Sequence, residues 1–120
     1  MTVEIYLASG SPRRQELLQQ LGVAFAVRVA DVVEEPGAEE TASDFVTRLA
    51  LAKAQAIWQA LADEARRPVL GADTEVVLDK QILGKPRNRE HGIEMLQMLS
   101  GRTHQVLTGV ALIAQQSSVC

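Results

Sequence analysis

The chain is poor in cysteine, histidine and aromatic residues, and each shortage excludes a class of protein. Its 120 residues include one cysteine, Cys120, and two histidines, so neither an internal disulfide nor a zinc centre built on thiolates is expected. Aromatic residues make up 3% of the chain, which leaves few platforms on which bases could stack. The net charge of −3 also argues against a general nucleic-acid-binding protein, so no nucleic-acid partner is expected.

Long apolar runs are missing as well, and so is a basic N-terminal segment of the kind that directs secretion. No stretch is long and apolar enough to span a bilayer, so we expect a cytoplasmic protein without a membrane partner. Apolar residues account for 47% of the chain and charged residues for 22%, without repeats or linker-like tracts. Residues 1–120 are therefore predicted to form a single domain with one core.

The most informative segment present runs Leu7-Ala-Ser-Gly-Ser-Pro-Arg-Arg14. An alternating apolar strand precedes it, Ser11 is placed to cap a helix, and Pro12 suits the first helical position. A helix N-terminus offers N–H groups to an anion, and Arg13 and Arg14 add guanidinium groups that match pairs of phosphate oxygens. The segment predicts a polyphosphate site. On spacing alone, a plain strand-to-helix turn with two solvated arginines explains it equally well.

A second segment places a carboxylate within an apolar run. Asp73 interrupts the run from Val69 to Leu78, and an ionised carboxylate in a buried strand is costly unless a cation, a metal or hydrogen bonds compensate it. Asp73 is therefore a candidate site residue. The alternative is an aspartate that caps a turn between two short strands. Lys85 follows a predicted turn at Asp79-Lys80, which could return it toward the same cleft.

The pattern of apolar and turn-forming residues predicts an α/β fold. The expected order is strand, helix, strand, helix, a strand pair, helix and strand. Helices are predicted from Pro12 to Leu21, from a cap at Thr41 or Ser43 to a break at 63–68, and from Asn88 to a stop at Gly101. The second strand is predicted from Phe25 to Val33 and the last from Thr103 to Ala114.

Four segments, LASGSPRRQELLQQLG, GADTEVVL, GKPR and LSGRTHQVLTGVAL, follow one another between residues 5 and 114. Together they resemble the Maf family of nucleoside triphosphate pyrophosphatases, also called septum formation inhibitor proteins. The resemblance implies a Maf/ITPase-like α/β fold, with a mixed β-sheet flanked by helices and a substrate cleft. It also implies hydrolysis of a nucleoside triphosphate between its α and β phosphates, which yields the monophosphate and pyrophosphate.

The resemblance further implies roles for individual residues. Asp73, helped by Glu34, would handle the water or a divalent cation, Mg²⁺ or Mn²⁺, although the adjacent Glu35 leaves the register open. Cationic side chains toward the phosphates would come from Arg13, Arg14, Lys53 and Lys85, and further substrate contacts from Ser9 and Thr74. From the residues alone, either Lys53 or its neighbour Arg48 could face a cleft, and a solvated lysine is the simpler interpretation.

The residues around Asp73 also narrow the expected substrate. Ala72-Asp73-Thr74 is similar to the family branch that acts on dTTP and UTP, which implies a house-cleaning role against these and modified pyrimidine triphosphates. Members of the family continue beyond the point where this chain stops and are expected to be homodimers. The chain is therefore expected to be a C-terminally truncated part of the fold with an uncovered apolar face. The alternatives are an inactive nucleotide-binding module and a regulatory protein of cell division.

Overall fold

The computed structural model describes residues 3–79, 81–83, 88–101, 105–114 and 117–119. The strands are β1 (Ile5–Ala8), β2 (Phe25–Val27), β3 (Val69–Leu78), β4 (Gln81–Ile82), β5 (Gln105–Ala114) and β6 (Ser117–Val119). The helices are α1 (Pro12–Gln20), α2 (Ala42–Ala60) and α3 (Arg89–Leu99), with a 3₁₀ turn at Asp63–Ala65. The expected α/β order is confirmed, with β6 as an addition that the sequence did not predict.

The six strands form one mixed sheet in the order β2-β1-β3-β5-β6, and β4 pairs with β3. β1 runs parallel to both β2 and β3, whereas β5 pairs with β3 in the antiparallel sense along nearly its whole length. β3 is a continuous strand of 10 residues that passes through Asp73. The alternative in which Asp73 caps a turn between two short strands is therefore wrong.

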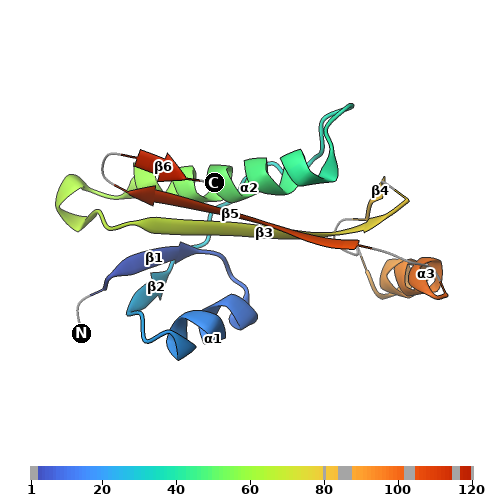
Figure 1. The fold of residues 1–120 in the computed structure, drawn as a ribbon, viewed down its shortest axis with the longest axis horizontal. Coiled ribbons are helices and arrows are strands. Elements are labelled where there is room, and N and C mark those ends of the chain that lie inside the picture. The colour runs from blue at the N-terminus through green and yellow to red at the C-terminus, as the bar shows by residue number, and fades with distance from the viewer. Residues whose placement is uncertain (1–2, 80, 84–87, 102–104, 115–116, 120) are drawn as a thin grey trace.

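Helices lie on both faces of this sheet (Figure 1). α2 covers one face of the long strands β3 and β5, α1 lies on the opposite side below β1 and β2, and α3 lies beyond the far ends of β3 and β5. The largest fully buried side chains come from α2 and the inner strands, namely Phe45, Leu49, Leu7 and Val69. The core is thus formed mainly between α2 and the central strands.

Two glycines allow α2 to approach the sheet closely. A Cβ atom at Gly71 would lie 2.1 Å from the carbonyl oxygen of Ala50, and one at Gly109 would lie 2.4 Å from that of Val46. Side chains larger than hydrogen do not fit at such distances, so the absence of a side chain on β3 and β5 sets the height of the helix above the strands. This close approach brings the next residues of α2 over the middle of β3.

Each of the three α-helices begins with a side-chain cap. Ser11, Thr41 and Asn88 accept hydrogen bonds from the backbone N–H groups of the residues three positions later. The predicted start of α1 is confirmed, and Thr41 rather than Ser43 caps α2. The second strand, by contrast, ends at Val27 and not at Val33. The N–H of Arg28 still donates to the carbonyl of Leu7 on β1. Because β1 ends at Ala8, the residues that follow Arg28 have no neighbouring strand to pair with.

The face of β5 that points away from α2 is largely uncovered. Val106, Val110 and Leu112 are exposed there by 59%, 49% and 40%, and α3 carries no buried residue among those described. None of the described helices is both long enough and apolar enough to cross a bilayer.

Candidate active site

A gap in strand pairing along one edge of β3 creates the site. β1 pairs with β3 as far as Gly71, and pairing on this edge resumes at Val76, whose carbonyl accepts from the N–H of Leu83, and at Val77, which lies opposite Ile82 of β4. A cavity of about 550 Å³ opens beside the unpaired stretch that carries Asp73 and Thr74. Its lining comes from the end of β1, the following loop, α1, the segment after β2, α2 and β3. The lining residues are Ala8, Ser9, Gly10, Ser11, Arg14, Val29, Ala30, Asp31, Val32, Glu34, Lys53, Asp73 and Thr74.

The topology explains why the cavity forms at this place. β1 is flanked by β2 and β3, and the helices that precede these two strands, α1 and α2, lie on opposite faces of the sheet (Figure 1). Where neighbouring connections leave a parallel sheet on opposite faces, a crevice opens at the carboxyl ends of the strands, and ligands bind there. The end of β1 at Ala8 stands at this crevice.

Lys53 is the centre of the ion-pair network in the cavity. Its Nζ atom lies 3.1 Å from Oδ1 of Asp73 and 3.2 Å from Oε1 of Glu34. The side chains of Lys53 and Asp73 are only 16% and 7% exposed, whereas Glu34 is 35% exposed. Burial opposes a charge on Lys53, but the hydrogen bonds to Asp73 and Glu34 raise its pKa above the ordinary value. Lys53 is therefore protonated at neutral pH and compensates the buried carboxylate.

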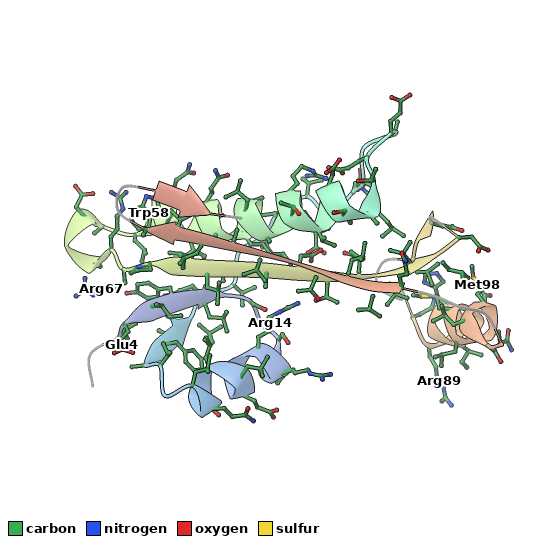
Figure 2. All side chains as sticks on the ribbon, in the orientation of Figure 1. Glu4, Arg14, Trp58, Arg67, Arg89 and Met98 are labelled. Atoms are coloured by element: carbon green, nitrogen blue, oxygen red, sulfur yellow. The ribbon has the colours of Figure 1, made fainter. Side chains whose placement is uncertain are left out.

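A second network occupies the opposite face of β3. Arg14 donates from Nη1 to Oγ of the buried Ser9 over 3.3 Å and from Nη2 to Oγ1 of Thr74. Ser9 also accepts from the backbone N–H of Ser11, and Thr74 shares a hydrogen bond of 3.0 Å with Thr108 on β5. Figure 2 labels Arg14, which belongs to α1, below the long strands. The arginine thus ties the loop after β1 to the sheet.

Glu75 is a charged neighbour of the site that sequence reasoning missed. Alternate residues of a strand share a face, so Glu75 lies on the same face of β3 as Asp73. Burial and the nearby negative charge of Asp73 raise the pKa of Glu75 from 4.5 to about 7. The two-residue spacing from Asp73 was a signal that could have identified it, whereas Thr108 depends on a strand register that the sequence does not reveal.

The structure brings most of the predicted site residues together. Ser9, Arg14, Glu34, Lys53, Asp73 and Thr74 all line the cavity. Glu34, and not Glu35, lines the cavity, and it forms an ion pair with Lys53. Arg48 forms an ion pair with Glu40 outside the cavity. Of the two basic residues of α2, Lys53 is therefore the one that faces the cavity.

Of the two remaining predicted residues, Arg13 is described by the structure and Lys85 is not. Arg13 is exposed and does not belong to the lining, because on α1 it projects in a different direction from its neighbour Arg14. Lys85 lies outside the described residues, and so does His104, which belongs to the fourth motif.

One carboxylate oxygen of Asp73 is suited to bind a hard divalent cation. Oδ2 of Asp73 is buried and has no hydrogen-bond partner among the described residues. Carboxylate oxygens are the ligands that Mg²⁺ and Mn²⁺ prefer, and Mg²⁺ is commonly held by one or two carboxylates together with substrate phosphates. Within the described part of the chain, no group of three or more acidic, histidine or cysteine residues forms a complete metal cage. Asp73 alone therefore does not complete the coordination of a cation.

A sequence model of the Maf-like protein family matches residues 4–120, nearly the whole chain. The chain belongs to the Maf-like family. Three relatives in this family are similar over more than nine-tenths of the chain, and each is named dTTP/UTP pyrophosphatase. The protein from Alkalilimnicola ehrlichii is 57% identical over 112 residues, that from Shigella dysenteriae 54% over 112 and that from Bacillus anthracis 52% over 116.

The match covers only part of each Maf-like relative. It includes 91%, 93% and 97% of this chain, but 55%, 56% and 59% of the relatives from the three organisms. The chain therefore spans little more than half the length of the curated relatives it matches. All lining residues of the cavity fall within the part that the family shares.

Proposed function

We propose that this chain carries the phosphate-binding and catalytic part of a nucleoside triphosphate pyrophosphatase that acts on dTTP and UTP. The observation that carries the proposal is the convergence of Lys53, Asp73, Glu34 and Arg14 on one cavity at the carboxyl end of β1. The names of the relatives support the choice of substrate. In the proposed reaction, water adds to phosphorus, the anhydride bond between the α and β phosphates breaks, and a monophosphate, pyrophosphate and a proton are released.

In this proposal Asp73 orients the water and accepts its proton. It is a suitable base because it is buried and because Lys53 holds its Oδ1 in place, which fixes the orientation of the carboxylate. Lys53 and Arg14 stabilise the negative charge that develops on the phosphate oxygens, together with the N–H groups of the loop around Ser9. Phosphoryl chemistry depends mainly on such positioning and charge stabilisation, so no covalent intermediate is required.

The charge of the cavity is the reason to include a divalent cation. Among the residues that the structure describes, its lining carries two cationic side chains, Arg14 and Lys53, against three carboxylates, Asp31, Glu34 and Asp73. These described side chains alone would offer a polyanionic triphosphate no excess of positive charge. We propose that Asp73 and Glu34, together with the substrate, would hold Mg²⁺ or Mn²⁺. The cation would supply Lewis-acid stabilisation of the phosphate oxygens.

The test is pyrophosphate release from a panel of nucleoside triphosphates with Mg²⁺ or Mn²⁺. The chain is compared with Asp73→Asn and with Asp63→Asn, a matched control because Asp63 is 87% exposed and lies outside the cavity. We expect turnover of dTTP and UTP that Asp73→Asn reduces by about 10²-fold or more and that Asp63→Asn leaves unchanged. Nucleotide binding without pyrophosphate release would instead identify a binding module, and turnover retained in Asp73→Asn would contradict the assigned base.

A further inference from the structure

The segment between β2 and α2 forms a large part of the cavity wall. Its lining residues are Val29, Ala30, Asp31, Val32 and Glu34. Among the described residues, no hydrogen bond between backbone groups joins residues 29–36 to a strand or a helix. The position of the segment therefore depends on side-chain contacts.

Arg48 of α2 makes contacts of this kind from outside the cavity. Its Nη2 atom donates to the backbone carbonyl of Glu35 over 3.0 Å. Its Nε and Nη2 atoms also donate to the two carboxylate oxygens of Glu40 over 2.8 and 3.0 Å, in the forked arrangement that makes arginine pairs strong and directional. The carboxylate of Glu40 in turn accepts from the N–H of Gly37 over 3.1 Å. Arg48 thus fastens the chain that follows the cavity wall to α2.

The helix therefore holds two adjacent residues of the segment. Lys53 pairs with the side chain of Glu34, and Arg48 bonds the carbonyl of Glu35. In the proposed reaction, Lys53 turns its charge to the phosphates and Glu34 turns its carboxylate to the cation, so their contact with each other competes with the ligand. The contact of Arg48 does not compete, because Arg48 does not line the cavity.

We propose that Arg48 is a positioning residue that holds residues 29–36 in the conformation that presents Glu34 to the cavity. The inference rests on the proposed function, because the role of Glu34 toward the ligand belongs to it. Without Arg48, the competent conformation would be populated only in part, and the apparent affinity for the substrate would fall by that fraction. A saturating substrate selects the competent conformation, so kcat would change little.

The experiment measures kcat and KM for pyrophosphate release from dTTP by the full chain with Mg²⁺. Arg48→Met removes all contacts of the guanidinium group. Arg48→Lys keeps the positive charge, but an ammonium group cannot reproduce the fork. Backbone order parameters of residues 29–35, measured by NMR on the free protein, report directly on the segment.

Arg66→Met is the matched control. Arg66 forms an ion pair with Asp63 and donates to the carbonyl of Trp58, just as Arg48 bonds a carboxylate and a carbonyl. Each guanidinium group also lies over an aromatic ring, Arg66 at 5.2 Å from the centre of Trp58 and Arg48 at 5.4 Å from that of Phe45. The control thus removes the same kinds of contact at a place outside the cavity.

We expect Arg48→Met to raise KM about tenfold, the effect of one hydrogen bond from a charged group, and to leave kcat within about twofold of the wild type. Arg48→Lys should raise KM nearly as much, and Arg66→Met should change neither constant. The order parameters of residues 29–35 should fall from about 0.85 to below about 0.6 in Arg48→Met and stay at the wild-type values in Arg66→Met.

Three results would overturn the assignment of Arg48. The first is a wild-type KM in Arg48→Met, and the second is a set of order parameters that this substitution leaves unchanged. The third is a wild-type KM in Arg48→Lys, which would show that the charge alone attracts the substrate. A wild-type chain that releases no pyrophosphate would instead contradict the proposed function, and the order parameters would still decide whether Arg48 holds the segment.

Discussion

Substitution of Lys53 by methionine should destabilise the fold by an amount that depends on Asp73. The lysine is the cation that the structure places against the 7%-exposed side chain of Asp73, and it also contacts Glu34. Removal of one partner from a buried ion pair costs about 3–5 kcal/mol, because the other charge remains buried without compensation. Since the side chain of Glu34 is 35% exposed, water can solvate part of the remaining charge. We therefore expect Lys53→Met to lower the free energy of unfolding by about 2–4 kcal/mol.

A double-mutant cycle with Asp73→Asn tests the reasoning by urea unfolding at pH 7. At this pH the contribution of Lys53 is fully present, because its raised pKa means that the contribution is lost only as the pH rises above 10.5. The double variant should be more stable than the sum of the single effects predicts, by about 1–3 kcal/mol. The control is Arg48→Met, which removes a half-exposed partner of Glu40 from the same helix and should lower the free energy of unfolding by less than about 1 kcal/mol. Single effects that add to within about 0.5 kcal/mol would refute the coupling.

Two further predictions concern Glu75 and Gly71. Because the pKa of Glu75 is raised from 4.5 to about 7, the stability of the wild type should fall as the pH rises through this interval. Glu75→Gln should therefore be more stable than the wild type at pH 8, by about 1–2 kcal/mol after allowance for solvent screening, and as stable as the wild type below pH 4.5. Urea unfolding at several pH values measures this difference. Gly71→Ala should cost about 3 kcal/mol or more, because its Cβ would lie 2.1 Å from the carbonyl oxygen of Ala50; a thermal unfolding midpoint equal to that of wild type would contradict the close approach of α2.

Much of the fold was predictable because its signals are local. Caps such as Ser11 and Asn88 and the alternation of apolar residues act over a few positions, and the structure confirms the elements that they predicted. The second strand is shorter than predicted, because the apolar pattern on which the prediction rested continues to Val33. Whether residues form a strand depends on a partner, and β1 ends too early to provide one.

The site was predictable to the extent that its residues lie in recognisable motifs. Ser9, Arg14 and Asp73 stand out by their local surroundings, and the structure places all three at one cavity. Which of two adjacent residues reaches the cavity was not predictable from composition, as the pairs Arg13 and Arg14 and Glu34 and Glu35 demonstrate. That choice depends on the direction in which a helix or loop turns a side chain, and long-range packing sets this direction.

The different lengths of β1 and β3 explain how one cavity reaches residues on both faces of a sheet. Asp73 and Thr74 are neighbours on β3, so their side chains point to opposite faces, one toward Lys53 on α2 and the other toward Arg14 on α1. If β1 continued beyond Ala8 along β3, it would separate the two faces and fill the edge between them. Because β1 stops opposite Gly71, the edge stays open at the two residues that follow Ala72, and the ion-pair network and the hydroxyl network meet around it. The end of β1 at Ala8 is thus what leaves the edge of β3 open at these two residues.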